Sequence, residues 1–195
     1  MKEEIEVKRK VFTVIEQLGE HSFKVERKGQ YFFLKKFEED AKRFEGFCDA
    51  EHRFRVSGVV TPKCYLYDKK TRIVVLDFIE GPSCLDILLK EGQLPEPAIE
   101  KLFKTFWYAR NDRMALNYQP ENFVYVNEKL YYLPFKYSKY VSNESFVQND
   151  LRLWFFTKDF IKHCHEQGID ADQSLLKSDY EINKSMALMT VKYYR

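Results

Sequence analysis

The sequence has few cysteines, no long apolar run and almost no excess of either charge. Its four cysteines, Cys48, Cys64, Cys84 and Cys164, lack the CxxC spacing of zinc sites and show no disulfide framework. We therefore expect reduced thiols in a cytoplasmic protein. No segment approaches the ~18 apolar residues of a membrane helix, and the charged start MKEEIEVKRK does not resemble a secretory leader.

The near balance of charge limits the classes of partner. Lys and Arg number 32 against 30 Asp and Glu, so bulk charge predicts neither a nucleic-acid partner nor a membrane partner. A hydrophobic content of 45% is typical of a folded protein rather than a disordered one. A chain of 195 residues suits one domain, or one domain built from two small lobes.

The first part of the chain predicts an antiparallel sheet with one helix. Five short segments rich in β-branched and aromatic residues are bounded by turn residues, and we interpret them as strands. They are VFTVIEQL (11–18), HSFKVER (21–27), QYFFLKKF (30–37), TPKCYLYD (61–68) and TRIVVLDFIEG (71–81). Between the third and the fourth, residues 38–57 carry Phe44, Phe47 and Phe54 near helical spacing, which predicts an amphipathic helix.

From Ser83 onward the pattern of apolar residues favours helices. We expect a short helix in SCLDILLKEG, a longer one in PEPAIEKLFKTFWYARNDRM, and two helical segments near 145–167 and 171–193. Within this region FVYV and KLYYL predict a hairpin across an Asn127-Glu128 turn. The order of elements therefore predicts an α+β protein with two lobes, 1–80 and 81–195.

The stretch LNYQPENFVYV (116–126) joins a polar loop to the first hairpin strand. In it Asn117 and Asn122 are separated by four residues that include Gln119-Pro120-Glu121. The stretch resembles the protein-kinase catalytic loop HRDxxxxN, in which the aspartate is the base and the asparagine binds metal. In this resemblance Asn122 matches the metal-binding asparagine, and Asn117 replaces the base with an amide.

Further segments resemble parts of the same protein-kinase-like fold, in the compact form of the small bacterial and RIO-type members. Phe33-Leu34-Lys35 matches the strand whose lysine binds phosphates, and Glu51 matches the ion-pair glutamate. IVVLDFIEG resembles the strand and hinge whose backbone, here from Asp77 to Ile79, faces adenine. Gly19 matches the first glycine of the GxGxxG phosphate loop.

The chain also departs from the family pattern. Pro134-Phe135-Lys136 stands where DFG supplies the Mg²⁺-binding aspartate. Glu20 brings negative charge to the phosphate loop, and Lys24 offers a partial offset. Asp150 matches the family's structural aspartate at a helix start and equally suits an N-cap. Residues 137–144 leave no room for an activation segment that cradles a peptide.

The resemblance implies a small bilobal kinase-like fold: a five-stranded antiparallel N-lobe sheet with one helix, and a helical C-lobe with the catalytic-loop hairpin. An amide at Asn117 cannot accept a proton, so the rate acceleration of ~10²–10⁴-fold that a general base supplies is lost. We expect a pseudokinase that binds an unidentified protein partner and, weakly and without Mg²⁺, ATP. The alternatives are an atypical small Ser/Thr or small-molecule kinase with rearranged residues and a plain α+β interaction domain. Whether the protein is an enzyme therefore stays open.

Apart from Asn122, the sequence offers no metal site. On a helix His163 and His165 point about 200° apart, so they cannot share one ion and are expected on a helix surface. In the last helix Met186 and Met189 favour a core-facing side, with a partner-docking side as the alternative.

Overall fold

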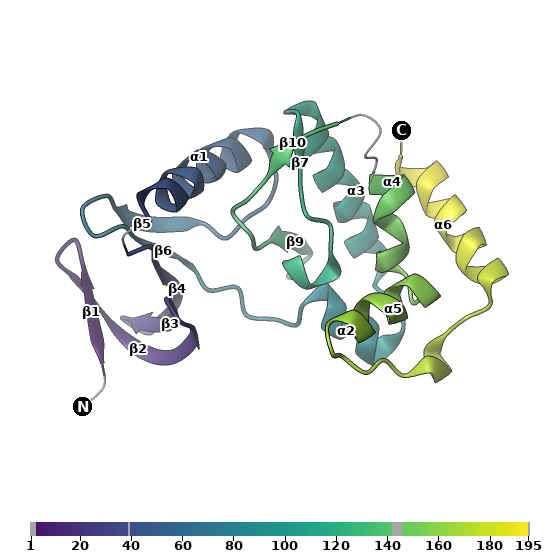
Figure 1. Cartoon of the computed structure of the whole chain (residues 1–195), viewed down its shortest axis with the longest axis horizontal. Helices are drawn as coiled ribbons and strands as arrows, with labels where there is room; N and C mark the ends of the chain where they lie inside the picture. The colour runs from purple at the N-terminus through teal and green to yellow at the C-terminus, as the bar shows by residue number, and fades with distance from the viewer. Residues whose placement is uncertain (1–2, 39, 142–145, 195) are drawn as a thin grey trace. The chain divides into compact units, whose positions relative to one another are not determined.

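The computed structural model describes residues 3–38, 40–141 and 146–194, the side chains of 148 and 149 excepted. The chain is an α+β protein that divides into two units (Figure 1). The first comprises Met1–Arg53 and Thr61–Glu80, and the second comprises Phe54–Val60 and Gly81–Arg195. Among the described residues, no helix has both the length and the apolar composition required to cross a bilayer.

A six-stranded antiparallel sheet forms the first unit, in the order β1-β2-β3-β4-β6-β5. Its strands are β1 (Glu4–Val7), β2 (Lys10–Gly19), β3 (Ser22–Arg27), β4 (Gln30–Lys36), β5 (Cys64–Asp68) and β6 (Ile73–Asp77). The sheet curls, because Phe12 on β2 contacts Tyr65 on β5 with ring centres 6.4 Å apart although three strands separate them.

The prediction of five strands was wrong because β1 was missed. In β1 the buried Ile5 and Val7 alternate with exposed glutamates, a period-two pattern hidden within the charged start of the chain. Lys8 and Arg9 form the two-residue turn to β2 with φ of 49° and 63°, the backbone conformation of a tight hairpin.

Different groups pack on the two faces of this sheet. One face carries the apolar cluster of the unit: Ile5, Val7, Phe12, Phe23, Val25, Phe32, Leu34, Ile73 and Val75. On the opposite face, helix α1 (Ala41–Ser57) packs through aromatic side chains. Phe44 and Phe47 lie 5.7 and 5.8 Å from the Phe37 ring, and Phe44 lies 6.3 Å from Tyr67. The predicted helix therefore exists, and it begins at Ala41 rather than at residue 38; residue 39 lies outside the described part.

The second unit is mainly helical. Its helices are α2 (Cys84–Glu91), α3 (Glu96–Asn111), α4 (Phe146–Asn149), α5 (Lys158–Glu166) and α6 (Asp179–Tyr193), with short 3₁₀ turns η1 (Pro120–Asn122), η2 (Leu151–Trp154) and η3 (Gln173–Leu175). Two short antiparallel pairs accompany them, β7 (Met114–Ala115) with β10 (Ser138–Lys139) and β8 (Phe123–Val126) with β9 (Lys129–Tyr132). The predicted FVYV–KLYYL hairpin is confirmed, with Val126 paired to Lys129 and φ positive at Asn127 and Glu128.

The continuous helix expected at 145–167 is replaced by α4, η2 and α5 in succession. Its expected first residue, Ser145, lies outside the described residues. Phe155 and Thr157 break the helical path with extended backbone, and the Thr157 hydroxyl accepts from the Phe160 N–H to start α5. The helix expected at 171–193 likewise starts later, where Ser178 and Glu181 form a capping box.

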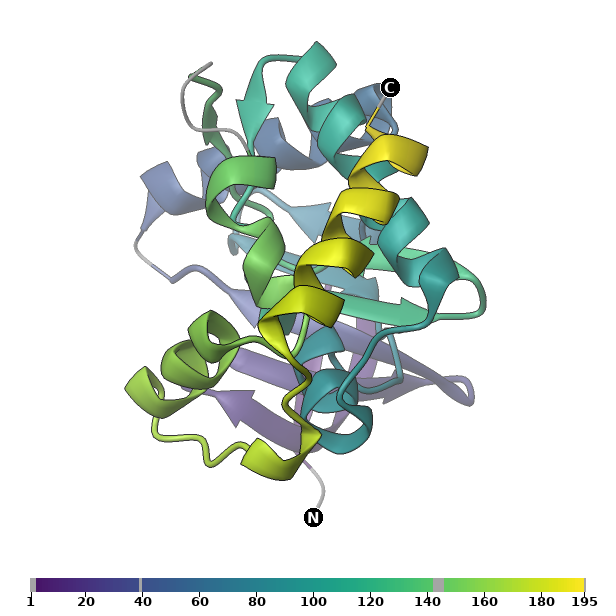
Figure 2. The same ribbon diagram turned by 90° about the vertical axis from the view of Figure 1, so that its right-hand side faces the viewer.

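α6 lies alongside α3 (Figure 2). Aromatic residues near the C-terminal ends of both helices form one cluster. Phe106 lies 5.8 Å from Tyr194 with nearly parallel rings, and Trp107 lies 5.3 Å from Tyr194. Ile182 is the buried residue of α6, whereas Leu188 and Val191 are exposed, so the expected core-facing side of α6 exists but is narrow.

Candidate functional site

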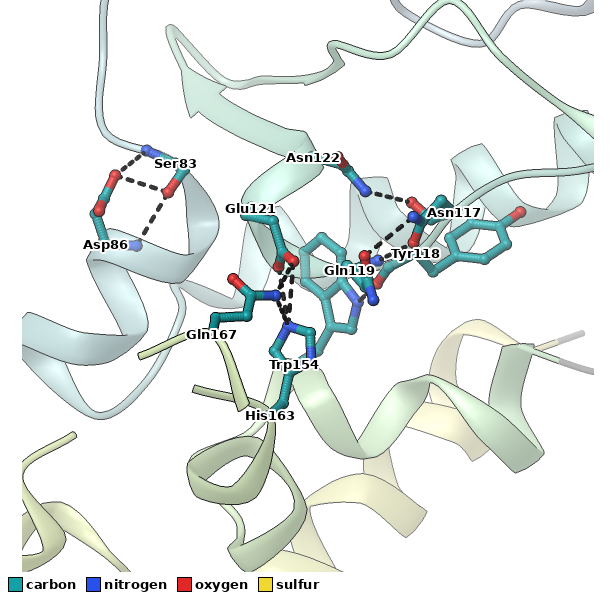
Figure 3. Close-up of polar contacts among 10 residues, drawn as sticks. All are labelled: Ser83, Asp86, Asn117, Tyr118, Gln119, Glu121, Asn122, Trp154, His163 and Gln167. Carbon is teal, nitrogen blue, oxygen red and sulfur yellow. Dashed lines mark hydrogen bonds and ion pairs between the residues drawn. The ribbon is translucent and has the colours of Figure 1, made fainter. Parts of the chain in front are cut away.

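The loop that resembles a kinase catalytic loop is held by its own amides (Figure 3). Asn117 Oδ1 accepts from the Gln119 backbone N–H at 3.2 Å, and Asn117 Nδ2 donates to Gln119 Oε1 at 3.0 Å. Asn122 Nδ2 donates to the Asn117 carbonyl at 3.3 Å. The structure thus brings Asn117 and Asn122 together, and both side chains stabilise the turn.

A buried tryptophan anchors the same loop. Trp154 Nε1 donates to the Tyr118 carbonyl at 2.7 Å, and both side chains are nearly fully buried. Asp150, predicted to hold the loop or to cap a helix, makes no side-chain cap hydrogen bond at the start of η2. Burial raises the pKa of its carboxyl group above the ordinary range. The described contacts therefore give the anchoring role to an indole that the sequence analysis did not identify.

Tyr132 joins the loop to the segment that follows the hairpin. Its hydroxyl donates to the Lys136 carbonyl at 2.9 Å and accepts from the Asn117 N–H at 3.4 Å. Burial raises the pKa of Tyr132 to about 12, so the phenol stays protonated at neutral pH. The Pro134-Phe135-Lys136 triplet is consequently tied to the loop through its backbone, and Pro134 has no side-chain oxygen to offer a metal ion.

The carboxylate of the loop, Glu121, is occupied by residues of α5 and its C-terminus. Its oxygens lie 3.1 and 3.2 Å from His163 Nε2, and Gln167 Nε2 donates to Oε1 at 2.7 Å. The His163 side chain is only 11% exposed, so its expected position on a helix surface was wrong. His165 is exposed. The sequence contained no local signal for this contact, because 42 residues separate Glu121 from His163.

In the first unit, Lys35 is an exposed residue of β4 and Glu51 is a half-buried residue of α1. Lys35 lies on the same face of the chain as Phe37, and its Nζ lies 5.4 Å from the centre of the Phe37 ring. Glu51 is half-buried one helical turn beyond Phe47. Burial, followed by the charge of Glu51, raises the pKa of the Cys64 thiol on β5 to about 12, which places Glu51 near the sheet.

The turn that matches the phosphate loop is a closed hairpin. Gly19 pairs with Ser22 across a two-residue connection, and its φ is not in the left-handed region. The His21 carbonyl accepts from the Lys36 N–H at 2.9 Å. The His21 ring lies 3.1 Å from a Glu38 oxygen and 3.7 Å from a Glu20 oxygen. Two carboxylates therefore surround the place where the resemblance requires phosphate.

The backbone at the end of β6 is partly used within the sheet. The Asp77 N–H donates to the Lys63 carbonyl at 2.9 Å, and the Phe78 N–H donates to the Tyr31 carbonyl at 3.4 Å. Ile79 follows in a segment without regular structure. Two of the three N–H groups from Asp77 to Ile79 thus have partners inside the unit.

Lys24, expected to offset the charge of Glu20, points elsewhere. Its Nζ lies 4.6 Å from the Tyr31 ring centre, 4.4 Å from the Phe78 ring centre and 3.5 Å from a Glu80 oxygen. The side chain is 16% exposed. Its ammonium group therefore attaches the segment after β6 to the sheet through cation–π contacts.

The candidate residues thus form two groups, one in each unit. Lys35 on β4 and Glu51 on α1 belong to the first unit, and Asn117 and Asn122 share the amide-bonded loop of the second. Among the described residues no group of three or more His, Cys, Asp and Glu side chains has the arrangement of a metal site. No model of a known protein family matches the sequence, and no curated protein is significantly similar to it.

Proposed function

We propose that this protein is a pseudokinase-like binding module, which acts by binding a protein partner and not by metal-dependent phosphoryl transfer. The observation that carries the proposal is the hydrogen bonding of the Asn117 side chain within its own loop. Both ends of its amide are bonded to Gln119, at 3.2 and 3.0 Å, at the position where a kinase places its base. A side chain bonded in this way stabilises a turn and has no basic group for a substrate hydroxyl.

The neighbouring groups support the same conclusion. The carboxylate of Glu121, the nearest acid in the loop, is already bonded by His163 and Gln167. Pro134 stands where the family binds Mg²⁺ through aspartate. A rearranged kinase would need an available acid near Asn122, so these contacts oppose the atypical-kinase alternative.

The first unit adds reasons to expect weak nucleotide binding. The V-A-I-K pattern carries alanine two residues before the lysine, whereas this chain carries Phe33 on the same face as Lys35. Lys24 on β3 is directly opposite Phe33 on β4. The Phe33 ring and the Lys24 side chain therefore occupy the sheet surface next to Lys35. Glu20 in the β2–β3 turn and Glu38, which follows β4 and contacts His21 of that turn, repel phosphate.

Thermal unfolding with ATP, in the presence and absence of Mg²⁺ or Mn²⁺, tests the proposal. A competent site at a ligand concentration of 100 times Kd would stabilise the protein by about 2.7 kcal/mol, which is roughly 5–10 °C for a chain of this size. We expect a smaller shift that does not depend on the metal. Lys35→Ala should abolish whatever shift remains.

Lys36→Ala is the matched control, because Lys36 is the next residue of β4, lies on the opposite face and contacts the Phe23 ring at 5.0 Å. If both substitutions change ATP binding equally, the assignment of Lys35 is wrong. A large metal-dependent shift accompanied by turnover of ATP contradicts the proposal itself.

Asn117→Asp examines the loop directly. The new carboxylate still accepts from the Gln119 N–H, so the turn should persist. We expect no Mg²⁺-dependent phosphoryl transfer to a protein substrate, since Pro134 still offers no metal ligand. Activity restored by this substitution alone would show that the remaining site is competent, contrary to our reasoning.

A further inference from the structure

Four cations gather at one end of the sheet in the first unit: Arg9, Lys10, Arg27 and Lys28. They come from the β1–β2 turn, the start of β2, the end of β3 and the β3–β4 turn. The pairing of Thr13 with Glu26 brings Arg27 beside Phe12 and the β3–β4 turn beside Lys10. Because neighbouring strands lie about 4.8 Å apart, the basic cluster spans roughly 10 Å.

A single tyrosine lies beneath the basic cluster. Lys10 Nζ and Arg27 Nη1 both donate to the Tyr65 hydroxyl, at 3.2 and 3.4 Å. Lys10 also lies 4.3 Å from the centre of the Tyr65 ring. The hydrogen bond from Lys10 lowers the pKa of Tyr65, consistent with a phenol that faces positive charge. Two cations thus share one neutral oxygen as their acceptor.

The basic cluster differs from the cations of the second unit. There Lys104 pairs with Glu100, Lys158 with Asp179 and Lys162 with Glu166. Within the described part of the chain, none of the four cluster cations forms an ion pair with a carboxylate.

Strand geometry explains this separation of charge. Lys10 and Arg27 extend on the side of the sheet that carries Val7 and Val25. Glu6 and Glu26, the carboxylates of the same strands, alternate with these residues and lie on the opposite side. The pleat therefore leaves Lys10 and Arg27 on one side of this end of the sheet, whereas the Glu26 carboxylate accepts from the Gly29 N–H in the β3–β4 turn.

We propose that the basic cluster binds an acidic segment of a partner protein, whose carboxylates replace the Tyr65 hydroxyl as acceptors for Lys10 and Arg27. A short acidic peptide fits better than a nucleic acid for two reasons. The cluster is compact and does not continue as a track for successive phosphates, and the Tyr65 ring that would stack a base is covered by Lys10 and contacts Phe32 at 4.8 Å. The proposal uses none of the candidate-site residues, so it does not depend on nucleotide binding.

Fluorescence anisotropy with a labelled poly-glutamate peptide tests the proposal on the full chain. We expect salt-sensitive binding that the triple substitution Lys10→Gln, Arg27→Gln and Lys28→Gln weakens about tenfold, which corresponds to about 1.4 kcal/mol. Glutamine keeps much of each side-chain stem and its hydrogen-bonding capacity, which protects the fold. As a second variant, Arg9→Gln with Lys28→Gln changes only turn residues and should weaken binding in the same direction.

The matched control is Lys104→Gln, Lys158→Gln and Lys162→Gln, which removes the same net charge from exposed positions of the second unit. Equal weakening by the cluster and control triples would show attraction by net charge alone and overturn the proposal. Absence of peptide binding at low ionic strength would overturn it as well. Tighter binding of a length-matched oligo-deoxythymidine than of the peptide would assign the surface to nucleic acid instead.

Discussion

Replacing Trp154 by phenylalanine should loosen the loop of residues 117–122 more than any other conservative change near it. Trp154 Nε1 donates to the Tyr118 carbonyl at 2.7 Å, and the indole is 1% exposed. The substitution keeps an aromatic ring against Phe123, whose centre lies 5.1 Å from that of Trp154, but removes the only donor described for this carbonyl.

The expected cost has two parts. Leaving the buried Tyr118 carbonyl without a donor costs about 1–3 kcal/mol. Exchanging indole for phenyl loses roughly 50 Å² of buried apolar surface, or about 1 kcal/mol. The sum is about 2–4 kcal/mol. This is a large part of the free energy of unfolding of a typical domain, which is roughly 5–15 kcal/mol.

Urea unfolding followed by tryptophan fluorescence measures this cost. The chain has two tryptophans and both belong to the second unit, so each single substitution leaves one indole to report on that unit. Trp107→Phe is the matched control, because Trp107 Nε1 is buried and has no hydrogen-bond partner among the described residues. That substitution removes the same ring atoms without breaking a hydrogen bond, so it should cost about 1 kcal/mol or less.

Equal midpoints for the two variants, with unchanged m values, would refute the reasoning. In that case the bond to Tyr118 would contribute nothing net, and the loop would be held by its amides alone. A change in m for Trp154→Phe would instead indicate a looser native state of the unit, and the midpoint comparison would then be replaced by hydrogen exchange at Tyr118 and Asn122.

Four further substitutions test other contacts by chemical unfolding. Gly92→Ala should cost about 2 kcal/mol, because φ is 68° and the added Cβ would lie 3.2 Å from Leu175 Cβ. Gly168→Ala, with φ of 72° and nothing within 4 Å, should cost about 1 kcal/mol, and equal costs would exclude crowding. Asp150→Asn should stabilise the protein at neutral pH, because burial raises the pKa of the Asp150 carboxyl group. The stability that Asp150 contributes is therefore complete below its ordinary pKa and is lost as the pH rises through the raised pKa. The gain should disappear in acid, and a gain that is independent of pH would contradict this assignment. Tyr132→Phe should cost about 1–2 kcal/mol, because its hydroxyl bonds the Lys136 carbonyl at 2.9 Å; an unchanged midpoint would argue that water replaces it.

Local sequence patterns predicted the elements whose signals are short in range. The β8–β9 hairpin was predictable because a polar pair, whose Asn127 tolerates positive φ, lies between two apolar segments. α3 was predictable because Ile99, Leu102, Phe103 and Phe106 recur on one helical face and are all buried. In contrast, β1 was missed because two buried side chains among charges give a weak signal, and 145–167 was misassigned because Trp154 is held by a tertiary contact.

In the candidate site, too, local contacts were predictable from the sequence and long-range contacts were not. The internal bonding of Asn117 and Gln119 follows from an Asx turn and was accessible from the loop sequence. The bonds of Glu121 to His163 and of Tyr118 to Trp154 connect residues 42 and 36 positions apart. Only the packing of α5 and η2 against the loop brings these residues together, and one sequence does not encode that in any local pattern.

The short strand β1 also affects how the protein behaves when shortened. The ten-residue strand β2 carries Val11, Ile15 and Leu18, which are 47%, 43% and 44% exposed, and β1 pairs with its first four residues, Lys10 to Thr13. A chain cut after Val7 would expose a long row of unpaired backbone groups beside these apolar side chains, which is a template for strand pairing between molecules. Such a truncated form would be more prone to aggregate, because the four residues of β1 shorten the open edge of β2.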